Sequence, residues 1–211
     1  MADLNPTVFV VDDDPSIRES LGLLLSSAGY GVKTFASAKE FLKLERSSSG
    51  PACLVLDVKM PGISGLDLQA ELASRNYAIP VIFITGHGDI PMSVQAMKKG
   101  AVDFLSKPFD DDQLLDSVKA ALLKDEQIRS SLDEQKNIMK RLESLTPREY
   151  EILTYLITGM LYKQIASELK ISERTVKAHR KQVFAKVGVV SIADLVRLTE
   201  KAGIKPADFS F

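Results

Sequence analysis

Short apolar runs alternate with segments of helical length throughout residues 1–124, and this alternation limits the fold more than any other feature. Each run has the length and the β-branched residues of a buried strand. Strands separated by helices form parallel sheets with helices on both faces. We therefore expect an α/β domain, a doubly wound five-stranded parallel sheet, over residues 1–124. The expected strands are 8–11, 32–35, 53–56, 81–84 and 102–105.

Residues 110–142 contain neither proline nor glycine, and their apolar residues recur in an approximate heptad. The pattern predicts one long helix, and we assign residues 125–143 as a helical linker. Two interpretations of the repeat stay open: a last helix of the first domain followed by a solvated linker, or a coiled coil that joins two subunits. The repeat consists of Leu114, Val118, Ala121, Ile128, Leu132, Met139 and Leu142.

Residues 144–211 are expected to form a separate all-α domain of four helices. Thr146, Pro147 and Glu149 have the spacing of a capping box with proline at the first helical position, which places the first helix start.

Charge also distinguishes residues 1–124 from residues 144–211. Residues 1–124 hold 12 basic and 16 acidic residues, whereas residues 144–211 hold 11 basic and 7 acidic residues. An acidic part suits a cation, and a basic part suits phosphates.

Composition excludes two further classes of protein. No window holds the roughly 18 apolar residues that a membrane span needs, and the first residues lack a basic or apolar leader, so we expect a cytoplasmic protein with no membrane partner. Cys53 is the only cysteine, which rules out a disulfide within the chain. Its apolar neighbours suggest a small core residue, with a reactive thiol as the alternative.

Polar residues follow the predicted strands at their carboxyl ends, where open parallel sheets bind ligands. Asp12 and Asp13 follow the first strand, Asp57 the third, Thr85 the fourth and Lys107 the fifth. The three carboxylates would make an oxygen-rich pocket for Mg²⁺ or another divalent cation. A hydroxyl and an ammonium would complete a cradle for a phosphoryl group on Asp57. Taken singly, each residue could instead be a helix cap, a strand former or solvated surface.

The segments "VVDDD", "LVLDVKMPGISGLDL" and "VIFITGHGDIPMSVQAMKKGAVDFLSKPF" together resemble the receiver domain of two-component response regulators, over residues 6–124. The resemblance implies that Asp57 accepts a phosphoryl group from a phosphohistidine of a sensor kinase. It implies that Asp13 and Asp57 bind Mg²⁺ directly, with the backbone carbonyl of Lys59, while Asp12 acts through water. It also implies a cis peptide bond between Lys107 and Pro108. Asp14, followed by proline, is expected to cap the first helix.

Thr85 and Phe104 are the expected switch residues. When a phosphoryl group draws the Thr85 hydroxyl inward, Phe104 can rotate into the space, although Phe104 could simply be a core residue. Many receivers have tyrosine here, so a phenylalanine would switch through packing alone. His87, between two glycines, is expected to be a loop residue that responds to switching rather than a metal ligand.

The segment "KQIASELKISERTVKAHRKQVFAKV" indicates a helix, a turn near 170–172 and a second helix, the arrangement that places a helix in the DNA major groove. On the second helix Val176, Val183 and Val187 share one face, and basic and small residues lie opposite. Between Lys163 and Lys186 there are seven basic and two acidic residues. A generic basic surface helix would have a similar composition.

Residues 144–203 resemble the LuxR/FixJ class of output domains, which implies binding to double-stranded DNA. The match to its recognition helix implies that Lys177, Ala178 and Lys181 approach base edges. Two departures are Tyr162, where a small polar cap is usual, and Val189 with Val190, where a basic residue often lies. In this class the last helix, here with Leu195, Val196 and Leu198, forms the dimer face. The expected backbone contacts are Lys163, Thr175, His179 and Arg180.

We therefore expect a regulator of transcription, more an activator than a repressor, in which phosphorylation of Asp57 favours a homodimer that binds DNA. RNA polymerase is a further expected partner. There are two rival interpretations. A phosphohydrolase that uses Asp57 as its nucleophile would commonly carry a second acid two residues on, where this chain has Lys59, so we expect no enzyme. The second rival is a regulator whose receiver is never phosphorylated. The complete acidic set, together with Thr85 and Lys107, argues against it.

Overall fold

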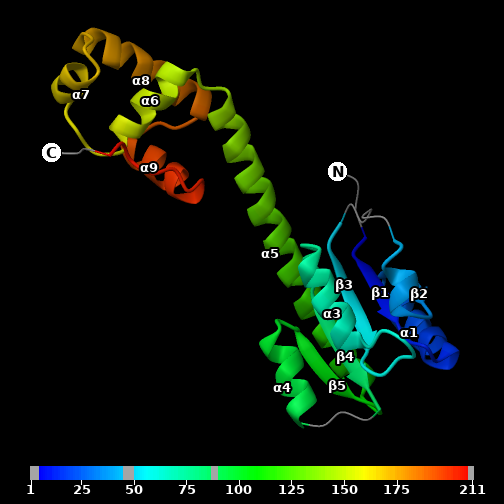
Figure 1. The fold of residues 1–211 in the computed structure, drawn as a ribbon. Coiled ribbons are helices and arrows are strands. Elements are labelled where there is room, and N and C mark those ends of the chain that lie inside the picture. The colour runs from blue at the N-terminus through cyan, green and yellow to red at the C-terminus, as the bar shows by residue number, and fades with distance from the viewer. Residues whose placement is uncertain (1–4, 45–49, 87–89, 209–211) are drawn as a thin grey trace. The chain divides into compact units, whose positions relative to one another are not determined.

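The computed structural model describes residues 5–44, 50–86 and 90–208, and it divides into two compact units, 1–129 and 130–211. Figure 1 shows the elements of each unit. The division at Arg129 falls inside the predicted linker 125–143, and the predicted boundaries at 124 and 144 stay a prediction. Within the described residues, no helix is long and apolar enough to cross a membrane.

The described part of the first unit contains a parallel sheet of five strands in the order β2-β1-β3-β4-β5, which confirms the predicted α/β class. Each strand begins and ends within two residues of its predicted position. The order reverses between β1 and β3, so the chain leaves a crevice at the carboxyl ends of these two strands. The strands are β1 Thr7–Val11, β2 Gly31–Phe35, β3 Ala52–Asp57, β4 Val81–Thr85 and β5 Asp103–Ser106.

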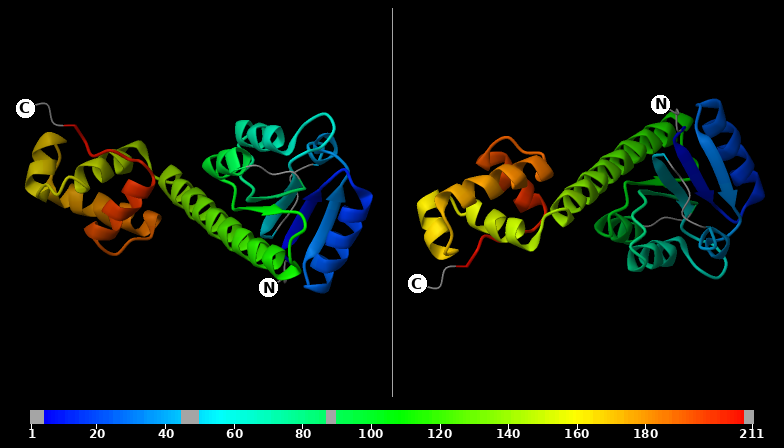
Figure 2. Two further views of the ribbon diagram at one scale, coloured as in Figure 1. Left: turned by 90° about the horizontal axis from the view of Figure 1, so that it is seen from below. Right: turned by 90° about the horizontal axis from the view of Figure 1, so that it is seen from above.

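Helices lie on both faces of the sheet (Figure 2). Alternate residues of the strands contribute to two apolar cores, one on each face. Phe9, Leu54 and Phe83 pack beneath α2, α3 and α4, while Val10 and Val55 pack beneath α1 and α5. Each central strand is buried on both faces and therefore reads as a continuous apolar run. The helices are α1 Pro15–Ser27, α2 Ala38–Phe41, α3 Gly65–Ser74, α4 Ile90–Lys98 and α5 Asp111–Glu143.

The helix α5 runs without a break from the first unit into the second. Its early heptad residues, such as Leu114 and Val118, are buried against the receiver-like sheet. Its late residues Ile138 and Leu142 are buried in the core of the second unit. Leu132 and Met139 are exposed. The apolar repeat is thus shared between two cores over much of its length, and a coiled coil stays a prediction for the exposed positions.

The second unit adds four helices to the end of α5 within the described residues, as predicted. Thr146 and Glu149 form the predicted capping box, with Pro147 at the first helical position. Val176, Val183 and Val187 are buried with Ile152 and other residues, so the predicted packing face of the second motif helix is confirmed. The helices are α6 Pro147–Leu156, α7 Tyr162–Glu168, α8 Glu173–Val187 and α9 Ile192–Lys201.

Candidate functional site

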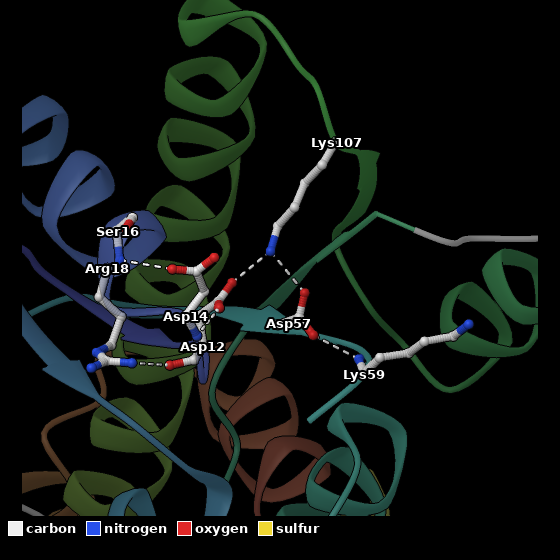
Figure 3. A network of polar contacts seen from close by, with 7 residues as sticks. All are labelled: Asp12, Asp14, Ser16, Arg18, Asp57, Lys59 and Lys107. Atoms are coloured by element: carbon white, nitrogen blue, oxygen red, sulfur yellow. Dashed lines mark hydrogen bonds and ion pairs between the residues drawn. The ribbon is translucent and has the colours of Figure 1, made fainter. Parts of the chain in front are cut away.

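Four neighbouring strands end at one edge of the sheet, and three of the predicted site residues meet there through direct bonds (Figure 3). Asp12 follows β1, Asp57 is the last residue of β3, and Lys107 follows β5. The Nζ atom of Lys107 lies 2.6 Å from Oδ2 of Asp12 and 2.9 Å from Oδ1 of Asp57. One ammonium therefore joins two carboxylates that come from positions 45 residues apart in the chain.

Backbone N–H groups hold the other carboxylate oxygens. The N–H of Lys59 donates to Oδ2 of Asp57 at 2.7 Å, and the N–H of Asp14 donates to Oδ1 of Asp12 at 2.9 Å. The side chain of Lys59 extends away from this centre in Figure 3. Each carboxylate is thus fixed by one backbone donor on one oxygen and by Lys107 on the other, so the two carboxylates have defined orientations.

Burial and charge act in opposite directions on these groups. Asp12 is 1% exposed and Asp57 is 5% exposed. Burial raises the pKa of Asp57 above its ordinary value, and the hydrogen bond and charge of Lys107 only partly offset that rise. For Lys107, burial lowers the pKa, but the hydrogen bonds and charges of Asp12 and Asp57 outweigh burial, so its pKa is raised. Lys107 therefore remains a cation at neutral pH.

Asp13 lies beside this centre rather than within the bonded group. Its side chain is exposed and lines a pocket of about 530 Å³ together with Lys59, Ser64 and Met92. Among the described residues, no three acidic, histidine or cysteine side chains are grouped so that they alone could hold a metal ion. The set does suit Mg²⁺, which retains several waters and needs only one or two carboxylates. The buried carboxylates of Asp12 and Asp57 already share one cation here, the ammonium of Lys107.

The expected switch residues lie close to this edge. Thr85, at the end of β4, is 1% exposed, and its backbone carbonyl accepts the N–H of Lys107 at 2.7 Å. Phe104 is half-buried, and its ring centroid lies 6.2 Å from that of Phe83. The peptide bond between Lys107 and Pro108 is cis, as predicted. His87 lies outside the described residues.

Two residues that support this edge were missed in the sequence. Arg18 of α1 donates to the backbone carbonyl of Asp12 at 2.7 Å, and its only sequence signal was its place one helical turn after the cap residue Asp14. Gly65 begins α3 directly against the end of β3. A Cβ atom at Gly65 would lie 2.3 Å from the backbone oxygen of Asp57, so the site needs a residue without a side chain there.

Two other predictions at single residues are confirmed. Asp14 caps α1, since its side chain accepts the N–H of Ser16 at 2.8 Å. Cys53 is fully buried, and burial, followed by the charge of Asp125, raises the pKa of its thiol to about 12. A thiol that stays protonated is a poor nucleophile, so Cys53 is a core residue.

The predicted helix-turn-helix consists of α7 and α8 in the second unit. Ser172 caps α8 by accepting the N–H of Thr175 at 3.1 Å, and Lys170 in the turn has a positive φ of 52°. The predicted DNA contacts differ in exposure. Lys163, Lys177, Ala178 and Lys181 are exposed, whereas Thr175, His179 and Arg180 are half-buried.

Aromatic rings hold two cations of this surface. The guanidinium of Arg180 stacks on Phe184, with its Cζ 4.0 Å from the ring centroid. The Nζ of Lys177 lies 5.9 Å from the ring centroid of Tyr162. Lys186, which was counted among the basic residues of the motif, is instead bonded to Glu149 at 2.6 Å. Its charge is neutralised within the domain, so the cationic surface is smaller than the sequence count.

One expectation for the second unit was wrong, and another stays untested. The cap of α7 is Leu161, not Tyr162, and it forms no side-chain cap; Gln164 satisfies the N–H of Leu161 at 2.9 Å instead. In α9, Leu195 and Leu198 are buried in the unit's own core, and Val196 is half-buried. α9 uses these two leucines to cover the domain core, and the dimer face expected on this helix stays a prediction.

Comparison with known proteins agrees with this geometry. Residues 8–119 match the response regulator receiver domain family, and residues 143–199 match the bacterial regulatory proteins of the luxR family. The chain is 51% identical over 197 residues to nodulation protein W of Bradyrhizobium diazoefficiens, covering 93% of this chain and 86% of that protein. It is 46% identical over 202 residues to response regulator protein TodT of Pseudomonas putida, and the match covers 95% of this chain and 88% of that protein.

Solved structures show the same likeness. The low-resolution structure of response regulator StyR is 49% identical, covers 93% of this chain and 99% of its own, and gives a TM-score of 0.84. The crystal structure of full-length FixJ from B. japonicum is 41% identical. The match covers 93% of this chain and 97% of the FixJ chain, with a TM-score of 0.55. Receiver domains typically bind Mg²⁺ at their phosphorylation site and imply a sensor kinase, and luxR-family domains imply DNA binding.

The bonded carboxylates at the strand ends, the helix-turn-helix and the two family matches point the same way, toward a regulator of transcription and not an enzyme. The chain belongs to the two-component response regulators that join a receiver domain to a LuxR-type DNA-binding domain.

Proposed function

We propose that Asp57 accepts a phosphoryl group from the phosphohistidine of a sensor kinase, and that this modification controls DNA binding by the second unit. The observation that carries the proposal is the shared ammonium: Lys107 bonds Asp57 and Asp12 at the carboxyl ends of the strands. Among the carboxylates that the structure describes at this edge, Asp57 is the buried one that ends a strand. Its two oxygens are fixed by Lys107 and by the N–H of Lys59.

The transfer forms a bond between phosphorus and a carboxylate oxygen of Asp57. The bond between phosphorus and the imidazole nitrogen of the donor breaks, and its electron pair returns to that nitrogen. Asp57 must be ionised to attack, and the charge of Lys107 opposes the rise in its pKa that burial causes. Lys107 and the hydroxyl of Thr85 then bind oxygens of the phosphoryl group. Catalysis here is mainly the placement of charge.

Asp13, Asp57 and the backbone carbonyl of Lys59 would hold Mg²⁺, with Asp12 acting through water. The fit is supported by the chemistry of the donors, all hard oxygens, and by the two carboxylates that already share one cation. When bound, Mg²⁺ supplies positive charge against the phosphoryl oxygens. Lys59 contributes through its backbone, in keeping with the outward direction of its side chain in Figure 3.

The consequence of phosphorylation is a change in packing and self-association. Thr85 moves toward the phosphoryl group, Phe104 rotates, and the receiver then favours a homodimer. The dimer binds paired half-sites through Lys177, Ala178 and Lys181 at base edges, with Lys163, Thr175, His179 and Arg180 on the backbone. It activates transcription through contact with RNA polymerase. A protein with a kinase donor and a DNA target acts in the cytoplasm.

The test is to incubate the chain with acetyl phosphate and Mg²⁺ and to compare it with Asp57→Asn. Intact mass should rise by one phosphoryl group in the wild-type chain and in the matched control Asp14→Asn, because Asp14 only caps α1. Asp57→Asn should stay unmodified. Removing Mg²⁺ with a chelator should stop the reaction in all samples.

Two results would overturn parts of the proposal. Phosphorylation of Asp57→Asn, or of neither chain, would remove Asp57 as the acceptor. If the wild-type chain is phosphorylated but its sedimentation and DNA affinity do not change, the chemistry stands and control by dimerisation fails.

A further inference from the structure

We infer that Tyr162 is a positioning residue of the DNA-binding surface, and that its ring orders the ammonium of Lys177 for contact with base edges. This inference rests on the proposed DNA contact of Lys177. Tyr162 is the first residue of α7, and Lys177 lies on α8, so the pair joins the two helices of the motif. The ammonium lies 5.9 Å from the ring centroid, within the range of a cation–π interaction.

The surroundings of Lys177 leave the ring as its partner. Lys177 is exposed, and no carboxylate of the described chain lies within ion-pair distance of its ammonium. An unrestrained lysine samples many rotamers, and ordering it at an interface lowers affinity about two- to tenfold. A ring that restrains the side chain before binding removes part of that loss.

Tyr162 itself is held in place by the core of its own unit. It is half-buried and packs against the apolar core of the second unit. No hydrogen bond to its hydroxyl is found in the described residues. The ring is therefore fixed by apolar packing, and the hydroxyl is not needed to hold it. A small polar residue at this place would provide no such surface.

The neighbouring pair shows the same device on α8. The guanidinium of Arg180 stacks on Phe184 at 4.0 Å, and the Nε of Arg180 is buried with no hydrogen-bond partner in the described structure. Ring contact, rather than a carboxylate, therefore orients this cation too. A cation held by a ring keeps its full charge for DNA, whereas Lys186, bonded to Glu149, does not.

A double-mutant cycle on the full chain tests the inference. The probe is a duplex selected from random sequence by the wild-type chain after treatment with acetyl phosphate and Mg²⁺. Tyr162→Leu should weaken binding about two- to fivefold and reduce the preference for the selected duplex over a scrambled one. In a Lys177→Met background the same substitution should change affinity by less than about 1.5-fold, because the partner cation is absent.

Matched variants separate the ring from its alternatives. Tyr162→Phe should keep the affinity of the wild type, because the ring remains. Tyr150→Leu removes a tyrosine of α6 that is 43% exposed and lies outside the motif, and it should bind as the wild type does. If Tyr162→Leu lowers the urea midpoint, Tyr162→Met replaces it, since methionine is flexible and a good helix former.

The outcomes distinguish this inference from the proposed function. If Lys177→Met binds as tightly as the wild type, both the DNA contact and the role of Tyr162 are overturned. If Lys177→Met binds weakly but the two substitutions are additive, only the role of Tyr162 is overturned. A loss in Tyr162→Phe equal to that in Tyr162→Leu would also overturn it, because the hydroxyl and not the ring would then matter.

Discussion

Asp125 of α5 accepts a 2.8 Å hydrogen bond from the backbone N–H of Ala52, the first residue of β3. The carboxylate is 2% exposed, and it also pairs with Arg129 at 2.6 Å. β3 ends at Asp57, so the strand that carries the proposed phosphoacceptor is fixed at its opposite end by the helix that continues into the DNA-binding unit. A second bond of 2.5 Å, from Ser117 to the carboxylate of Asp103, links α5 to β5 in the same way.

Replacing Asp125 with alanine should destabilise the receiver by about 1–3 kcal/mol, because the N–H of Ala52 would be left buried without an acceptor. Asp125→Asn retains an acceptor oxygen and should lose less. Native-state hydrogen exchange of the β3 amides measures the change. The control is Asp133→Ala, also on α5, whose exposed carboxylate lies 3.8 Å from Lys136 and should change stability by less than about 0.5 kcal/mol.

Gly65→Ala should disturb the site through the backbone of Asp57. The new Cβ would lie 2.3 Å from the backbone oxygen of Asp57, so the end of β3 or the start of α3 must move. We expect a loss of about 1–3 kcal/mol in stability and a slower phosphorylation by acetyl phosphate, followed by intact mass.

Gly22→Ala is the matched control for that substitution. Gly22 lies within α1, and a Cβ there would meet nothing within 4 Å. Alanine should stabilise the helix by about 0.4–1 kcal/mol and leave phosphorylation unchanged. If Gly65→Ala instead behaves like Gly22→Ala, the close approach of α3 to Asp57 is not a requirement of the site.

The sheet was predictable because its strands are buried on both faces. Runs such as 8–11 contain only apolar residues and are bounded by polar ones, and the edge where the strands end follows from their parallel direction. The meeting of Asp12, Asp57 and Lys107 at one edge was therefore expected. The ammonium that both carboxylates share was not, since sequence order carries no information about which oxygen a flexible lysine reaches.

The second unit shows the limit more clearly. Periodicity identified the buried valines of α8. The dimer face expected at Leu195 and Leu198 came from the family resemblance, and the structure shows these two side chains covering the core of their own unit. An apolar stripe on a helix predicts that this face is buried, but it does not identify the surface that covers it. Likewise the late apolar positions of α5 belong partly to the core of the second unit, where Ile138 and Leu142 pack, and no pattern in the helix alone could assign them.

Lys107→Met should tighten the binding of Mg²⁺ while it impairs the response to phosphorylation. The ammonium holds Oδ2 of Asp12 and Oδ1 of Asp57, the same oxygen-rich place that a dication would use. A single and a double positive charge about 5 Å apart repel by about 1.7 kcal/mol even in water, so affinity should rise at least about tenfold. A Mg²⁺ titration of the NMR signals of β3 measures it.

The control for this variant is Lys59→Met, because the Lys59 side chain extends away from the carboxylates and only its backbone is expected to matter (Figure 3). Its affinity for Mg²⁺ should change far less than that of Lys107→Met. Equal or weaker binding by Lys107→Met would show that the cation site and the lysine site do not overlap.

The stability of the DNA-binding unit should depend on acid through Glu149. Its Oε2 accepts the ammonium of Lys186 at 2.6 Å and the N–H of Thr146 at 2.7 Å. The bond from Lys186, followed by that from Thr146, lowers the pKa of Glu149 from 4.5 to about 2. A pKa that is lower in the folded state means that the contribution is complete above about pH 4.5 and is lost as the pH falls toward about 2.

Glu149→Gln should therefore be less stable than the wild type near neutral pH, and the difference should shrink between about pH 5 and about pH 2. Urea midpoints followed through the NMR signals of α6 and α8 measure this. Glu143→Gln, an exposed residue at the end of α5, serves as the control and should follow the wild-type curve. Lys186→Met removes the largest cause of the lowered pKa, so its curve should bend at higher pH than the wild-type curve. If Glu149→Gln keeps a constant difference from the wild type across this range, the ion pair does not join α6 to α8 in solution.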